Sequence, residues 1–141
     1  MADGRTLVAG EATGAALVLD EPLSLWGGLD PETGRVIEVR HPQHGAEVSG
    51  RVLVMPSGRG SSSSPSVLAE AIRAGTAPAA IVMREADPIV ALGAIVAREL
   101  YGKAIPVVVA DEETYRSLRT GTVLTVRADE ATAEVRTPTS P

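Results

Sequence analysis

Cysteine is absent from the 141 residues of this sequence. A chain without cysteine forms no disulfide bond of its own, and it has no thiolates with which to bind an iron–sulfur cluster. The sequence therefore predicts that this chain by itself holds no such cluster.

Aromatic residues are scarce as well. Phenylalanine is missing, and Trp26, Tyr101 and Tyr115 are the only aromatic side chains. The core must therefore consist mainly of Val, Leu, Ile and Ala. The 14 glycines and 10 prolines predict many tight turns and places where the backbone is accessible at close range.

Long hydrophobic runs are also lacking. No apolar stretch approaches the ~18 residues that a membrane span requires, and no basic segment followed by an apolar one opens the chain. The net charge of −5, from 18 acidic and 13 basic residues, disfavours nucleic acid as a partner. We expect a cytoplasmic protein with one domain, residues 1–141, that binds neither membrane nor nucleic acid.

The first half of the chain predicts short strands separated by turns. Apolar runs at Thr6–Ala9, Ala15–Leu19 and Val36–Val39 favour strands, and the Gly-rich and Pro-rich segment Glu21–Gly34 lies between the last two. These strands are expected to form a second sheet or a barrel-like layer.

The second half alternates strands and helices. Strands are predicted at Val52–Met55, Ala79–Met83, Val107–Ala110 and Thr122–Arg127, and helices at Pro65–Ala74, from Pro88 onward and at Asp111–Arg119. Such alternation favours an α/β fold with a parallel sheet and right-handed crossovers. Residues 128–141 are expected to form an edge hairpin or a frayed tail.

Apolar spacing predicts the buried face of two helices. In the first helix, Ser64 is the expected N-cap and the inner face consists of Val67, Leu68, Ala71 and Ile72. In the second, Asp87 is the expected N-cap and the inner face consists of Ile89, Leu92, Ile95 and Val96.

The Gly/Ser segment Gly58–Ser64 is the first candidate site, because it joins a predicted strand to a predicted helix. Ligands bind beyond the carboxyl ends of strands in α/β sheets, where helix N-termini favour negative charge. A serine there could act as a nucleophile or base, although a polar loop with a serine cap is the simpler reading. The segment matches neither a Walker A loop nor a nucleophile elbow.

Two other segments are weaker candidates. Trp26 is followed by Gly27 and Gly28, which suits either a lid or docking loop or an Ω-loop that covers the core. His41 and His44 have a metal-ligand spacing, but without a third ligand they are better interpreted as exposed turn residues. No metal site is predicted.

Several of these segments together resemble the small subunit, or swivel domain, of the aconitase X family. The similarity runs from about Val8 to Ala110, and it is carried by Pro22–Asp30, Gly45–Gly50, Arg51–Ser64, Gly75–Val82, Ala86–Val96 and Ile105–Val109. The resemblance implies a swivelling β/β/α domain, like that of aconitase. It also implies a larger, cysteine-bearing subunit that holds an iron–sulfur cluster, over which this domain closes.

The same resemblance implies a hydro-lyase that dehydrates cis-3-hydroxy-L-proline or mevalonate 5-phosphate. The aconitase motif, carried onto this sequence, makes Ser61 the catalytic base. Its substrate-binding arginine falls on Ser63 and is therefore missing, and Arg59 is a possible substitute. The remaining pocket candidates are Gly60, Ser62, Gly28 and Asp30.

Three functions follow from the sequence. The first is the small subunit of a heteromeric dehydratase, inactive alone, that acts on a small hydroxy acid, with cis-3-hydroxy-L-proline slightly preferred. The second is a non-catalytic partner-binding module that retains the swivel fold. The third is a stand-alone enzyme that binds phosphate through the Gly58–Ser64 segment.

Overall fold

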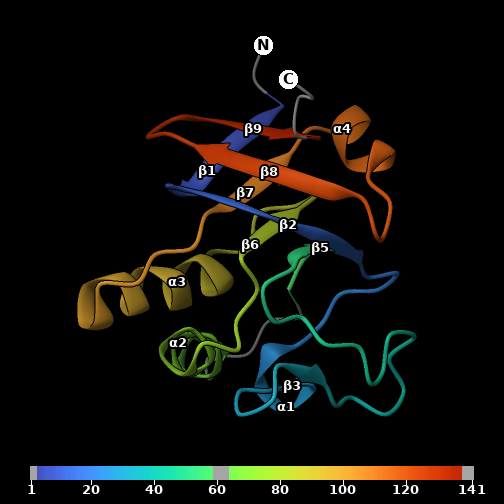
Figure 1. Ribbon diagram of the computed structural model, residues 1–141, viewed down its shortest axis with the longest axis vertical. Coiled ribbons are helices and arrows are strands. Elements are labelled where there is room, and N and C mark those ends of the chain that lie inside the picture. The colour runs from blue at the N-terminus through green and yellow to red at the C-terminus, as the bar shows by residue number, and fades with distance from the viewer. Residues whose placement is uncertain (1–2, 59–63, 138–141) are drawn as a thin grey trace.

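In the view of Figure 1, a closed seven-stranded barrel forms the upper part of the computed structural model, which describes residues 3–58 and 64–137. Its strands are hydrogen-bonded in the order β1-β7-β6-β5-β2-β8-β9. Their bounds are β1 Gly4–Val8, β2 Gly10–Val18, β5 Val52–Met55, β6 Ala80–Met83, β7 Val107–Ala110, β8 Val123–Ala128 and β9 Thr132–Arg136.

Parallel and antiparallel pairs are both present in the barrel. β2, β5, β6 and β7 are parallel neighbours, which confirms the predicted parallel sheet with crossover helices. β1 and β2 were expected to lie in a second layer, but they join the same barrel through antiparallel pairs with β7 and β8. The second, two-stranded sheet consists instead of β3, Leu29–Asp30, and β4, Arg35–Val36.

The C-terminal strand β9 closes the barrel. An edge hairpin or frayed tail was expected for residues 128–141, of which 138–141 lie outside the described residues. β9 does form a hairpin with β8, but it also pairs with β1, so the hairpin is not at an edge. Closure satisfies the backbone groups that an edge strand would leave exposed.

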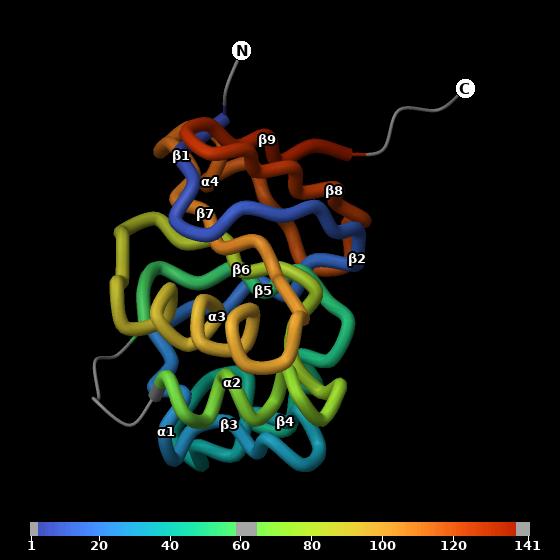
Figure 2. Tube along the Cα trace, turned by 90° about the vertical axis from the view of Figure 1, so that its left-hand side faces the viewer, coloured from blue at the N-terminus to red at the C-terminus, as the bar shows by residue number. Residues whose placement is uncertain are grey.

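The two long helices, α2 (Ser64–Ala74) and α3 (Pro88–Tyr101), lie together on one side of the barrel, and the short helix α4 (Glu112–Ser117) lies apart from them (Figure 1 and Figure 2). Figure 2 shows α2 and α3 between the barrel and a lobe that contains α1, Leu25–Gly28, and the β3–β4 sheet. The helix α4 follows β7. No helix within residues 3–58 and 64–137 has the length and apolarity to cross a bilayer.

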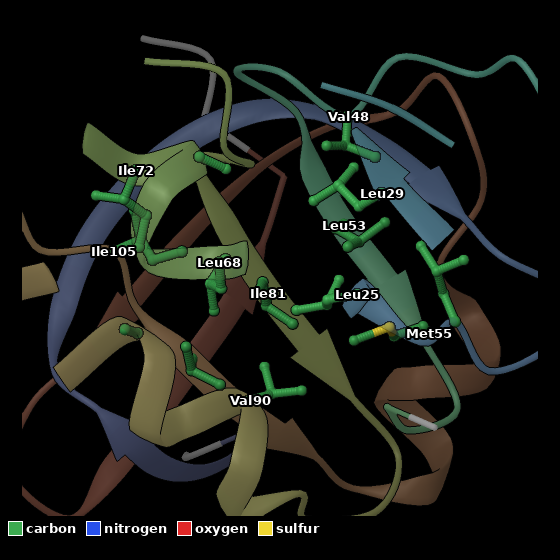
Figure 3. Close-up of a cluster of buried hydrophobic side chains, with 14 of the residues drawn as sticks. Leu25, Leu29, Val48, Leu53, Met55, Leu68, Ile72, Ile81, Val90 and Ile105 are labelled. Carbon is green, nitrogen blue, oxygen red and sulfur yellow. The ribbon is translucent and has the colours of Figure 1, made fainter. Parts of the chain in front are cut away.

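Two hydrophobic clusters hold these layers together. β5 and β6 are buried on both faces, because alternate residues of a strand point to opposite sides. Leu53 and Ile81 point outward to the cluster shared with the helices and the lobe (Figure 3), and Val54 and Val82 point into the barrel. The buried apolar residues described are Val, Leu, Ile, Ala and Met, which confirms the predicted aliphatic core.

The predicted face of α2 is correct, and that of α3 is correct only in part. On α2, Leu68, Ala71 and Ile72 are buried. On α3, Leu92 is 49% exposed, and the buried residues are Val90, Ala91, Gly93, Ala94 and Ala97. Ile95 and Val96 are partly buried against the same cluster, as predicted. Gly93 allows close packing against α2, because a β-carbon there would lie 3.0 Å from Cβ of Leu68.

Candidate functional site

The strongest sequence candidate lies outside the described residues. Arg59, Gly60, Ser61 and Ser62 belong to the segment 59–63, for which the structure gives no description. The residues on either side of that segment are described. They are Gly58, three residues beyond the end of β5, and Ser64, the first residue of α2.

Gly58 lies against the beginning of α3. A β-carbon on residue 58 would lie 2.3 Å from Oδ2 of Asp87 and 2.8 Å from Cγ2 of Val90, so a larger residue would displace one of them. Asp87 is the N-cap of α3, and its Oδ1 accepts a hydrogen bond of 2.9 Å from the Ile89 N–H, as predicted. The chain thus enters the candidate segment beside the N-terminus of α3.

Gly58 also contacts the second candidate segment, residues 22–34, which contains Trp26 and is called the Trp26 segment below. Leu23 forms an isolated parallel bridge with Gly58. Leu23 is fully buried, and a β-carbon on Gly28 would lie 2.9 Å from its Cδ1. Leu23 therefore connects the Trp26 segment to Gly58, the residue that precedes segment 59–63.

Trp26 itself projects from this region, with 59% of its surface exposed. The next residue, Gly27, has φ of 78°, a left-handed conformation that favours glycine. Ile37 and Val39 are also exposed, at 45% and 80%. Ile37 is tied to this turn, because its N–H donates to the Gly28 carbonyl over 2.8 Å.

Asp30 is engaged within its own turn. Its Oδ1 accepts from the Glu32 N–H and its Oδ2 accepts from the Thr33 hydroxyl, both over 2.9 Å. The Asp30 carbonyl accepts from the Gly34 N–H. These bonds account for Asp30 as a turn residue, and its role in a pocket stays a prediction.

His41 was expected to be exposed, and this expectation is wrong. It is 4% exposed, its Nδ1 accepts from the Gln43 N–H over 3.0 Å, and its Nε2 lies 3.1 Å from the Glu21 carbonyl. These partners assign the proton to Nε2. His41 therefore holds its loop against the end of β2, while His44 is exposed as expected. The described residues include no group of three His, Cys, Asp or Glu side chains that could hold a metal.

Sequence reasoning passed over Arg84 and Tyr115 as site residues. Arg84 follows β6 directly, and its N–H donates over 3.2 Å to the carbonyl of Pro56, the residue that follows β5. Its guanidinium carbon lies 5.7 Å from the ring centroid of Tyr115, on α4 after β7. The rule that sites gather at the carboxyl ends of parallel strands would have indicated both residues.

Burial raises the pKa of Tyr115, and the nearby Arg84 cation partly counteracts this effect. The negative charges of Asp20 and Glu112 raise the same pKa further. Asp20 lies beyond the end of β2, where its Oδ2 accepts over 2.8 Å from Nε2 of Gln43. The partly buried Tyr115 phenol is thus influenced by the cation of Arg84 and by the anions of Asp20 and Glu112.

Known proteins match this chain over most of its length. The family model described as "Aconitase X swivel domain" matches residues 1–135. The holo-form crystal structure of Thermococcus kodakaraensis aconitase X superposes with a TM-score of 0.83 and 37% identity, covering 96% of this chain and 97% of that chain.

Two named relatives belong to different dehydratases. A cis-3-hydroxy-L-proline dehydratase of Pseudomonas aeruginosa is 53% identical over 103 residues, which is 73% of this chain and 18% of that protein. A phosphomevalonate dehydratase small subunit of Methanothermobacter thermautotrophicus is 47% identical over 95 residues, which is 67% of this chain and 72% of that protein. The chain therefore spans about a fifth of the first relative and most of the second.

Proposed function

The chain belongs to the aconitase X swivel-domain family, and we propose that it is the small subunit of a hydro-lyase that removes water from cis-3-hydroxy-L-proline. The observation that carries this proposal is the identity with the Pseudomonas aeruginosa cis-3-hydroxy-L-proline dehydratase, 53% over 103 residues. The stretch that matches is a minor part of that protein. The remainder of the site is therefore assigned to a larger partner subunit.

Ser61 is the proposed proton acceptor. In the dehydration, the C–H bond next to the carboxylate and the C–O bond of the hydroxyl group break, and a C=C bond forms. The hydroxyl group leaves with the bonding electrons and departs as water once it is protonated. Ser61 Oγ takes the proton as an alkoxide, which requires strong electrostatic stabilisation. The first N–H groups of α2 begin three residues later in the chain, and free N–H groups at a helix N-terminus favour negative charge.

The residues of this chain do not fit an iron–sulfur cluster. The sequence has no cysteine, and no group of three potential metal ligands occurs in the part of the chain that the structure describes. We assign the cluster to the cysteine-bearing partner. This chain then contributes side chains such as Ser61 to the reaction, and no metal ligand. By itself, the chain is expected to convert nothing.

Mevalonate 5-phosphate is the second candidate substrate. It is favoured by the Methanothermobacter thermautotrophicus relative, which is itself a small subunit and of which this chain covers 72%. The two substrates differ in charge, because the phosphate compound carries a phosphate in addition to its carboxylate, whereas hydroxyproline carries a carboxylate and an amine. Assays of the reconstituted complex with both compounds separate the alternatives.

The test is co-expression with the partner subunit and a dehydratase assay of Ser61→Ala. We expect a loss of about 1000-fold or more in kcat with assembly unchanged. Ser66→Ala, an exposed serine in the first turn of α2, is the matched control and should retain full turnover. A Ser61→Ala complex with near-wild-type activity would remove the role of Ser61. A wild-type complex that is inactive on both substrates would favour a non-catalytic partner-binding module.

A further inference from the structure

We propose that Arg84 binds the carboxylate of the substrate. This inference rests on the proposed function, since it assumes a hydroxy acid bound at the carboxyl edge of the parallel strands. Both candidate substrates carry a carboxylate. Removal of the neighbouring proton adds negative charge to that part of the molecule, so a fixed cation there stabilises the transition state more than the bound substrate.

The backbone of Arg84 is anchored at this edge. The N–H groups of Arg84 and Glu85 both donate to the Pro56 carbonyl, over 3.2 Å and 3.0 Å. The segment after β6 therefore runs beside the segment after β5. This places the side chain of Arg84 at the end of the sheet where ligands bind in α/β folds.

The guanidinium of Arg84 lies over an aromatic ring and has no acidic partner within the described chain. Its one described contact is with Tyr115, 5.7 Å from the ring centroid. Six other arginines are paired with carboxylates on the surface: Arg35, Arg73, Arg98, Arg116, Arg127 and Arg136. A guanidinium stacked on a ring keeps its N–H groups available, and it can bind a carboxylate with two parallel hydrogen bonds.

Tyr115 restricts where this cation can lie. The ring is half-buried against the barrel cluster. Its helix is held by Asp111, whose Oδ1 accepts from the Thr114 N–H over 2.8 Å. Because Tyr115 is fixed by packing, it reduces the conformational freedom that Arg84 would lose on binding an anion.

Three of the nearby acids have other partners, and the first of them, Glu112, pairs with Arg116 over 2.8 Å. Asp20 accepts a hydrogen bond from Gln43, and Asp87 caps α3. Arg84 thus remains available to a ligand at this edge, and it fills the role for which the aconitase-type arginine is missing at Ser63.

The test uses the complex of this chain with its partner subunit. Arg84→Gln is expected to lower kcat/KM by about 100-fold, and Arg84→Lys, which keeps the charge but not the two parallel bonds, by about tenfold. Arg98→Gln is the matched control, because Arg98 is exposed and lies on the last turn of α3. It should remain within about twofold of the wild type.

A second measurement separates carboxylate binding from a structural role. L-Proline is compared as an inhibitor with L-prolinamide, in which a neutral amide replaces the carboxylate. The wild type should prefer L-proline, and Arg84→Gln should lose that preference while it assembles and melts like the wild type. Unchanged kcat/KM and unchanged preference in an active Arg84→Gln complex would overturn this proposal alone. A wild-type complex inactive on both substrates would overturn the proposed function and this inference with it.

Discussion

Oδ2 of Asp87 lies 2.3 Å from the position that a β-carbon on Gly58 would occupy. The residue that leads into the candidate segment is therefore in direct contact with the N-cap of α3. The same Asp87 satisfies the Ile89 N–H through its other oxygen. Asp87 can therefore keep its capping position only if residue 58 has no side chain.

Gly58→Ala is expected to lower the free energy of unfolding by about 1–3 kcal/mol, because the new methyl group displaces Asp87 or Val90. Asp87→Ala alone is expected to cost about 0.5–2 kcal/mol through loss of the cap. In the double variant the Gly58 substitution should cost less, since Oδ2 is gone. Denaturant unfolding of the four proteins measures this coupling, and strictly additive effects would contradict the contact.

Trp26→Ala is expected to leave the isolated chain almost as stable as the wild type, within about 0.5 kcal/mol, because the indole is 59% exposed. It should weaken binding of the partner subunit by about tenfold or more, since exposed Trp residues are frequent binding hot spots. Leu100→Ala, on the last turn of α3 and 67% exposed, is the control for loss of an exposed apolar side chain. Equal affinities for both variants, measured by calorimetry, would exclude Trp26 from the interface.

The ionisation of Tyr115 should report its contact with Arg84. Burial raises the pKa of Tyr115, and Arg84 lowers it while Asp20 raises it. In a Tyr101→Phe background, ultraviolet titration follows Tyr115 as the remaining tyrosine. Arg84→Gln should then move the midpoint upward and Asp20→Asn should move it downward. A midpoint that neither variant moves would contradict the described arrangement.

Acid should destabilise the chain through two aspartates. Hydrogen bonds from the backbone N–H of Thr114 and of Thr132 hold the pKa values of Asp111 and Asp129 below their usual range. A carboxylate with a lowered pKa contributes stability above its unfolded pKa of about 3.9, and this is lost as the pH falls through the folded pKa.

Asp111→Asn and Asp129→Asn should each flatten this acid dependence, because Asn accepts the same backbone bonds without titrating. Thermal unfolding between neutral and strongly acidic pH measures the slope. The double variant should show the sum of the two effects. A slope identical to that of the wild type would contradict the assignment.

Local sequence signals predicted those elements whose determinants lie close together in the chain. The Asp87 cap and the continuous apolar runs of β5, β6 and β7 required no knowledge of the fold, since capping and strand burial are readable over a few residues. The α/β alternation likewise predicted the parallel order of these strands.

The burial of α3 and of His41 could not be predicted in this way. α3 is apolar on more than one side, so periodicity alone does not select the face that carries Val90 over the one that carries Leu92. His41 is buried because Glu21 and the Gln43 backbone supply its hydrogen bonds, and Glu21 is 20 residues away in the chain. Both outcomes depend on neighbours that are distant in sequence.

The sequence by itself determined the composition of the core, the order of the elements, the lack of thiolate ligands and the Gly/Ser segment that contains Ser61. The tertiary structure decided that β9 closes the barrel onto β1, that Leu23 brings the Trp26 segment against Gly58, and that Arg84 lies over Tyr115. Composition and local periodicity are properties of neighbouring residues, whereas these contacts join residues that only the closed barrel and its packed helices bring together.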